Sequence, residues 1–148
     1  MSDWWQWSPI KANQKLGFAV VGIGRFGSAV CRELLRNGAD VLAVDFSEKA
    51  IEELRQLEPT IEARVVDSTD EESMKEAGVL EMGTVVVGIS EPIEASITTT
   101  LIAKDTEGSL VKQVIARATS DLHEKMLKRV GADPVSYTHL TLPTILLV

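Results

Sequence analysis

Apolar and polar positions change their period several times along the middle of the chain. Short runs that are apolar at nearly every position alternate with longer segments in which apolar residues recur every three or four positions. The first pattern predicts strands buried in a parallel sheet, and the second predicts amphipathic helices. The predicted strands are 18–23, 40–45, 62–66, 84–90 and 111–118, with the start of a sixth at 132–135.

Strands and helices alternate five times with short connections. This order is typical of a parallel sheet with helices on both faces, and right-handed crossovers leave few topologies for it. We therefore predict an α/β fold with a doubly wound, Rossmann-like parallel sheet of about six strands.

Capping and turn residues mark the ends of the predicted helices. Ser47 precedes the second helix, TDEE at 69–72 fits a capping box for a short third helix, and Asn37–Gly38 and Gly78 provide stops. The side chains expected to face the sheet are Phe26, Ala29, Val30 and Leu34 in the first helix, Ile51, Leu54 and Leu57 in the second, Ile93, Ile97 and Leu101 in the fourth, and Leu122, Met126, Leu127 and Val130 in the fifth.

The two ends of the chain depart from this alternation, so we expect three segments. Residues 1–16 contain all three tryptophans and are expected to form an arm that folds back onto the domain or a neighbour, with a membrane-interface anchor as the alternative. Residues 17–135 form the predicted nucleotide-binding domain. Residues 136–148 lack Asp, Glu, Lys and Arg, and we interpret them as an atypical tail that reflects truncation or added sequence.

Composition narrows the class of protein. The formal net charge of −7 argues against nucleic acid as a partner, because broad nucleic-acid binding needs a basic face. A single cysteine, Cys31, excludes an internal disulfide and favours a reducing, cytoplasmic setting. Cys31 lies in a predicted helix and is interpreted as a packed thiol rather than a nucleophile. No apolar run has the length of a membrane span.

The stretch VVGIGRFGSA, residues 20–29, carries the first candidate chemistry. Gly22, Gly24 and Gly27 have the spacing G-x-G-x-x-G between a predicted strand and a predicted helix. The first glycine permits the tight turn, the second lets the backbone approach a pyrophosphate, and the third lets the helix pack against the strand. The positive end of the helix dipole then faces the anion, so the motif predicts a nucleotide site.

Acidic residues follow the next two predicted strands. Asp45 comes 21 residues after Gly24, where a carboxylate can accept from both ribose hydroxyls and repel a 2′-phosphate, so NADP is disfavoured. Asp67, followed by Ser68, is placed to accept from the amino group of adenine. Each aspartate has an alternative role as a cap of the next helix. These residues indicate an ADP moiety but do not separate NAD, ATP, ADP and AMP.

No catalytic group accompanies the predicted nucleotide site. A dehydrogenase needs a substrate domain and a proton-transfer residue beside the nicotinamide, and this length leaves no room for a second domain. His123 and His139 are interpreted as incidental, and no cluster has the spacing of metal ligands.

The segment FAVVGIGRFGSAVCRELLRNGADVLAVDFSEKAIEEL, with VVDSTDEESMKEAGV, VVVGISEPIEASITTTLIAK and LKRVGADPV, resembles the RCK or KTN domain of TrkA-N type. The resemblance covers about residues 17–135. It implies a non-enzymatic, cytoplasmic subunit of a Trk or Ktr potassium uptake system. Such domains assemble into rings, commonly of eight, beneath a membrane-embedded pore protein, and NAD, NADH, ATP or ADP changes the shape of the ring. The residues implied to bind the nucleotide are Gly22, Ile23, Gly24, Arg25, Phe26, Gly27, Asp45, Phe46, Asp67, Ser68, Ser90 and Arg117.

Within this resemblance, Arg25 acquires a role. It stands at the predicted helix N-terminus beside the phosphates, where it is placed to pair with a pyrophosphate or with the third phosphate of ATP in its own or a neighbouring subunit. The alternative is a surface arginine, opposed by the helix dipole.

Two other functions stay open. One is a truncated NAD-dependent oxidoreductase, and the other is a stand-alone nucleotide-binding module that regulates another transporter. A module that signals through its shape needs a self-interface, so we expect at least a dimer, with Thr98–Thr100 and the tryptophan arm as candidate contacts.

Overall fold

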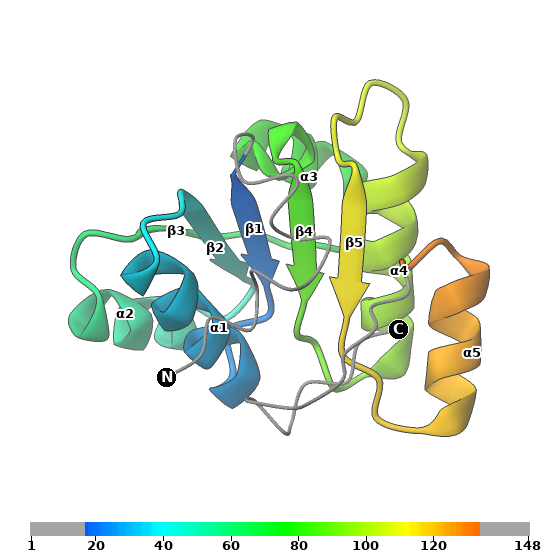
Figure 1. Ribbon diagram of the computed structural model, residues 1–148, viewed down its shortest axis with the longest axis horizontal. Coiled ribbons are helices and arrows are strands. Elements are labelled where there is room, and N and C mark those ends of the chain that lie inside the picture. The colour runs from blue at the N-terminus through cyan, green and yellow to red at the C-terminus, as the bar shows by residue number, and fades with distance from the viewer. Residues whose placement is uncertain (1–16, 134–148) are drawn as a thin grey trace.

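The computed structural model describes residues 17–133, and these form one parallel sheet with helices on both faces (Figure 1). The strands are β1 (Phe18–Val21), β2 (Val41–Asp45), β3 (Glu62–Val65), β4 (Thr84–Val87) and β5 (Gln113–Ala116), in the order β3-β2-β1-β4-β5. The helices are α1 (Arg25–Arg36), α2 (Glu48–Leu57), α3 (Glu71–Ala77), the 3-10 turn η3 (Val79–Glu81), α4 (Ile93–Asp105) and α5 (Asp121–Arg129). The predicted α/β class is confirmed. The expected arm at 1–16 and tail at 136–148 lie outside the described residues.

Alternate side chains of the buried strands supply two separate cores. Phe18 and Val20 of β1 face the side covered by α1 and α2, whereas Ala19 and Val21 face the side covered by α3, α4 and α5. Each buried strand is therefore apolar except at an end, as at Thr84 and Gln113, which explains why the strands appear as continuous apolar runs. The outer strand β3 lacks this double burial, and only Ala63 is buried among its residues.

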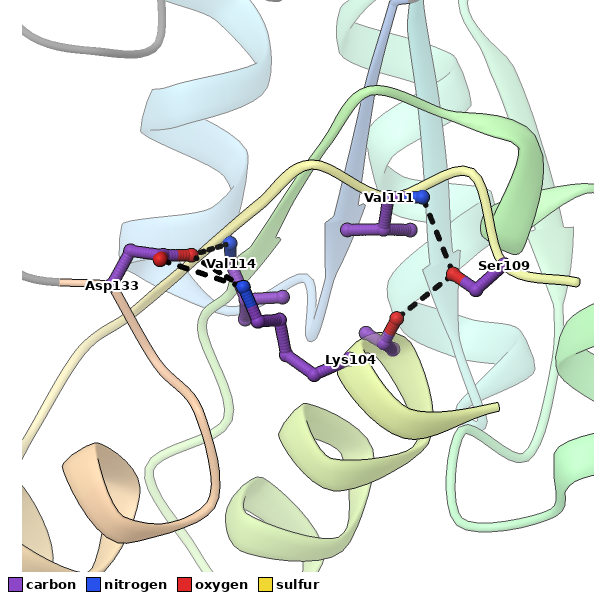
Figure 2. Close-up of polar contacts among 6 residues, drawn as sticks. Lys104, Ser109, Val111, Val114 and Asp133 are labelled. Atoms are coloured by element: carbon purple, nitrogen blue, oxygen red, sulfur yellow. Dashed lines mark hydrogen bonds and ion pairs between the residues drawn. The ribbon is translucent and has the colours of Figure 1, made fainter. Parts of the chain in front are cut away.

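The described residues hold five strands rather than about six. Ala132 and Asp133 are not in a strand, and 134–135 lie outside the description. The Asp133 carboxylate accepts the backbone N–H of Val114 at 2.7 Å and pairs with Lys104 Nζ at 3.2 Å (Figure 2). These bonds attach the turn after α5 to the start of β5 and to α4, and the Asp133 N–H also donates to the Val114 carbonyl at 2.8 Å.

Several predicted helix ends are confirmed, and one is wrong. Ser47 caps α2 by accepting the Ala50 N–H at 3.2 Å, and Gly78 ends α3 in the left-handed region. The cap of α3 is Asp70, which accepts the Ser73 N–H, and not Thr69 of the predicted capping box. Thr69 donates to Asp67 instead, because the aspartate two residues earlier closes a local turn with it.

The predicted inward faces of α4 and α5 are wrong in part. The buried face of α4 consists of Ser96, Thr99, Thr100 and Ala103, at spacings of three and four. In α5, His123 and Leu127 point inward. Ser96, Thr99, Thr100 and His123 are hydrogen-bonded in the interior. They occupy the buried faces of the two helices, so larger apolar side chains lie on the exposed faces. Exposed apolar side chains that were expected inside are Leu57 (58%), Leu101 (40%), Leu122 (66%) and Met126 (41%), and Ala29 of α1 is exposed too.

Candidate functional site

A cavity of about 210 Å³ lies at the carboxyl ends of the strands, where β1 and β4 pair and their connections diverge to opposite sides of the sheet. Ligands of doubly wound folds bind at such a switch point. Seven residues predicted to bind the nucleotide line this cavity: Gly22, Gly24, Asp45, Phe46, Asp67, Ser68 and Ser90. The remaining lining residues, which sequence reasoning did not place there, are Val21, Thr69, Gly88, Ile89, Glu91, Pro92 and Ala95.

Each of the three glycines in the turn is explained by a different feature of the local geometry. Gly22 has a φ of +94°, a left-handed conformation that other residues rarely adopt. A Cβ on Gly27 would lie 1.9 Å from the Gly22 carbonyl oxygen, so α1 packs against the turn only with glycine there. A Cβ on Gly24 would meet nothing within 4 Å, because this residue faces open space at the cavity. Gly24 is also the N-cap of α1 and offers no side chain to its amides.

Asp45 fixes the glycine turn to the end of β2. Its Oδ2 accepts the backbone N–H of Ile23 at 2.6 Å, and its Oδ1 accepts the N–H of Ser47 at 2.8 Å. The carboxylate thus joins the glycine turn to the start of α2. The predicted alternative, a cap of the next helix, accounts for the bond to Ser47 but not for the bond to Ile23. Each carboxylate oxygen can accept a further hydrogen bond, so a ribose role is compatible with these contacts.

Asp67 and Ser68 line another part of the cavity. Asp67 Oδ1 accepts both the N–H and the hydroxyl of Thr69, and these hydrogen bonds lower the pKa of this exposed carboxyl group. Within residues 17–133, Asp67 Oδ2 has no hydrogen-bond partner and remains available as an acceptor. Ser68 is nearly buried, and its hydroxyl lies 2.7 Å from Thr99 Oγ1 of α4.

An aromatic side chain stands on the rim beside Asp45. The Phe46 side chain is 80% exposed although it lines the cavity, so it presents an apolar surface where a planar base can stack. The hydrophobic pattern alone does not distinguish Phe46 from a core residue. Its position directly after the predicted strand 40–45 places it at the edge of the sheet where the cavity lies.

The two arginines of the predicted site lie apart from the cavity lining. Arg25 is the first residue of α1 and is exposed, and its side chain makes no hydrogen bond or ion pair with the described part of the chain. Arg117, just after β5, holds its guanidinium 5.4 Å from the centre of the buried Phe26 ring, a cation–π contact. Phe26 therefore supports Arg117 beside the start of α1.

The groups interpreted as structural are buried away from the cavity. The Thr119 N–H donates to His123 Nδ1 at 3.1 Å, so the ring carries its proton on Nε2 and donates to Ser96 Oγ at 3.0 Å. Burial lowers the pKa of His123 and raises that of Cys31 to about 12. Residues 17–133 contain no group of His, Cys, Asp or Glu suited to a metal ion, and His139 lies outside them. No helix in the described residues is long and apolar enough to cross a membrane.

Comparison with known proteins places this geometry in context. A family model described as the TrkA-N domain matches residues 18–138. The chain is 40% identical over 121 residues to the Ktr system potassium uptake protein C of Bacillus subtilis, covering 82% of this chain and 52% of that protein. The chain thus spans about half the length of the curated relatives that it matches.

Solved structures have the same fold. The TrkA-N domain of the inner membrane protein ybaL from Escherichia coli superimposes with a TM-score of 0.69 and 24% identity, over 80% of this chain and 84% of that one. The GsuK channel bound to NAD gives a TM-score of 0.66 at 17% identity, over 78% of this chain and 20% of that one. The same channel bound to ADP gives 0.63 at 17% identity, over 79% and 30%.

Proposed function

Because the chain belongs to the TrkA-N domain family, we propose that it is a nucleotide-sensing regulatory domain of a potassium uptake system. It binds an adenine nucleotide at the switch-point cavity, and the bound nucleotide changes how the domain packs against its partners. The observation that carries this proposal is the convergence of seven predicted binding residues on one cavity at the positive end of α1.

The ligand is NAD, NADH, ATP or ADP, held in three parts. The turn from Gly22 to Gly27 receives phosphate, Asp45 accepts from the ribose, and Asp67 accepts from the adenine amino group. The carboxylate of Asp45 opposes a 2′-phosphate, so NADP is disfavoured. NAD and ADP in the GsuK channel support this ligand class.

Ile23, Phe26, Ser90 and Arg117 complete the proposed site. Ile23 contributes the amide that Asp45 holds, Ser90 lines the cavity, and Phe26 supports Arg117 through its ring. Arg25, exposed at the helix start, is placed to pair with the third phosphate of ATP in its own or a neighbouring subunit.

The domain acts as a homo-oligomer, as a dimer or within a ring of eight. The exposed apolar side chains of Leu101, Leu122 and Met126 on α4 and α5 support a self-interface. Of the threonines expected to make it, Thr99 and Thr100 are fully buried, so they do not contribute to this surface.

The physiological partner in this proposal is an integral-membrane potassium channel or transporter subunit, and nucleic acid is not a partner. The domain lies at the cytoplasmic face of the membrane through that subunit and is not an enzyme. The names of the curated relatives support this role over a truncated oxidoreductase. A module that regulates a different transporter is the second candidate, since the cavity does not specify the membrane partner.

A thermal-shift panel with NAD, NADH, NADP, ATP, ADP and AMP tests the proposal. A ligand at 100 times its dissociation constant stabilises a protein by about 2.7 kcal/mol. We expect stabilisation by the adenine nucleotides and less by NADP. Stabilisation by none of them contradicts the proposal, and oxidation of NADH with a substrate favours the oxidoreductase.

A further inference from the structure

The loop after β3 is tied to α4 through one pair of buried hydroxyls. Thr99 Oγ1 lies 2.7 Å from Ser68 Oγ and 3.3 Å from the Ser68 carbonyl oxygen. In residues 17–133, these are the hydrogen bonds that join the loop 66–70 to α4. Thr99 is fully buried and does not line the cavity, whereas Ser68 lines it, as does Ala95, one helical turn before Thr99. Thr99 therefore joins two walls of the cavity.

One arrangement of the two hydroxyl protons makes both contacts hydrogen bonds. A carbonyl oxygen only accepts, so the single Thr99 hydroxyl proton goes to the Ser68 carbonyl. The 2.7 Å contact is then a hydrogen bond only if the Ser68 hydroxyl donates to Thr99 Oγ1. The Ser68 proton is thereby directed away from the cavity, and its oxygen remains only an acceptor.

The side chain of the neighbouring Asp67 also presents a hydrogen-bond acceptor to the cavity. Asp67 commits Oδ1 to Thr69 and leaves Oδ2 as an acceptor, and hydrogen bonds keep this carboxyl group ionised. The wall formed by Asp67 and Ser68 thus presents acceptors without a side-chain donor. Such a wall matches a base whose edge carries an amino donor and opposes a base that presents a carbonyl oxygen there.

We infer that Thr99 is a positioning residue that makes the base-binding wall an acceptor and so favours adenine over guanine. This inference rests on the proposed nucleotide site. Thr99 acts through Ser68 and touches no ligand. Without its hydroxyl, Ser68 loses both its partner and its orientation, and its proton is free to turn into the cavity and donate to a carbonyl oxygen of the base.

The test measures dissociation constants of ADP and GDP by titration calorimetry for the wild-type chain and for Thr99→Val, which keeps the side-chain shape and removes the hydroxyl. We expect the GDP-to-ADP ratio of dissociation constants to fall by about 2- to 12-fold, the range for one neutral hydrogen bond. Thr99→Ser keeps the hydroxyl and should retain the wild-type ratio. Thr100→Val is the matched control, because Thr100 is equally buried but donates only to the Ser96 carbonyl of its own helix, at 2.9 Å.

The outcomes separate this inference from the proposed function. If the wild-type chain binds ADP and Thr99→Val leaves the ratio unchanged, or Thr100→Val lowers it as much, the inference about Thr99 is wrong while the nucleotide site stands. If the wild-type chain binds neither ligand, the proposed site fails, and this inference fails with it. Should Thr99→Val not fold, Ser68→Ala removes the same acceptor from the cavity wall, and an unchanged ratio in that variant overturns the inference.

Discussion

At the residue scale, Asp45 has a structural role and a proposed binding role, and a single substitution affects both. Its carboxylate holds the amides of Ile23 and Ser47 and is the proposed acceptor for the ribose hydroxyls. Asp45→Ala should weaken the binding of NAD, ATP and AMP alike, each by about 1.5–3 kcal/mol, the range for hydrogen bonds to a charged group. Calorimetry measures the three affinities.

The turn geometry needs its own control in that experiment. Asp45→Asn keeps one oxygen acceptor and the side-chain size, so it should preserve more of the free energy of unfolding than Asp45→Ala. Unchanged affinity for both NAD and ATP in folded Asp45→Ala would show that the ribose assignment is wrong.

His123 predicts how stability depends on pH. Its folded-state pKa is lowered from about 6.5 by burial, so the unfolded chain binds a proton more readily than the folded one. The stability contributed by the neutral ring is complete above pH 6.5 and is lost as the pH falls below that value. Urea unfolding at pH 8, 7, 6 and 5 should show this loss in the wild type and a smaller loss in His123→Gln. Parallel pH profiles for the two proteins would contradict the assignment.

At the scale of elements, Arg25 is the first residue of α1, where the proposed site would hold a third phosphate. In the proposed site the amides of the turn receive a pyrophosphate, so Arg25→Ala should reduce ATP binding by about 1.5–3 kcal/mol and AMP binding much less. Arg25→Lys should restore only part of the lost ATP affinity, because the point charge of an ammonium group does not reproduce the two parallel donors of a guanidinium group.

Arg32→Ala is a suitable control for Arg25, since it removes one charge from the same helix where Arg32 pairs with Glu58 at 3.4 Å. An ATP-to-AMP affinity ratio that is the same in the wild type and Arg25→Ala would exclude a phosphate-sensing role.

The sequence predicted the strands and the glycine turn because both depend on local rules. Strands buried on both faces are apolar at most positions, and the turn needs glycine at Gly22 and Gly27 for backbone reasons. The faces of α4 and α5 were less predictable. Thr99 and His123 are satisfied in the core by hydrogen bonds to Ser68 and Ser96, which are distant in the sequence. Local periodicity does not predict such pairs.

The same limit applies to the candidate site. Predicted residues near the ends of β1, β2 and β3 line the cavity because parallel strands end at one edge of the sheet. Glu91, Pro92 and Ala95 were missed, since their position depends on how α4 approaches the sheet. The cation–π contact between Arg117 and Phe26 likewise joins segments 91 residues apart, and no local pattern announces it.

At the scale of the whole molecule, the exposed apolar residues of α4 and α5 predict self-association. Light scattering at tens of micromolar should give at least a dimer, because Leu122 and Met126 lie one turn apart on α5 and a buried interface would remove both from water. Replacing both Leu122 and Met126 with Glu should shift the mass toward the monomer. Leu57→Glu, on α2, is the control, since Leu57 is similarly exposed and lies on the other face of the sheet. A strict monomer in the wild type, with and without nucleotide, would count against the oligomeric proposal.

The most direct test of the nucleotide site compares Gly24→Ala with Gly27→Ala and the wild type. An alanine methyl at Gly24 meets nothing within 4 Å but enters the space at the cavity, whereas one at Gly27 collides with the Gly22 carbonyl. Calorimetric titration with ADP, together with urea unfolding, should therefore show that Gly24→Ala loses less stability than Gly27→Ala and loses at least about tenfold in ADP affinity, equivalent to about 1.4 kcal/mol. Gly27→Ala should lose stability itself. Wild-type ADP affinity in a folded Gly24→Ala chain would contradict nucleotide binding at this turn.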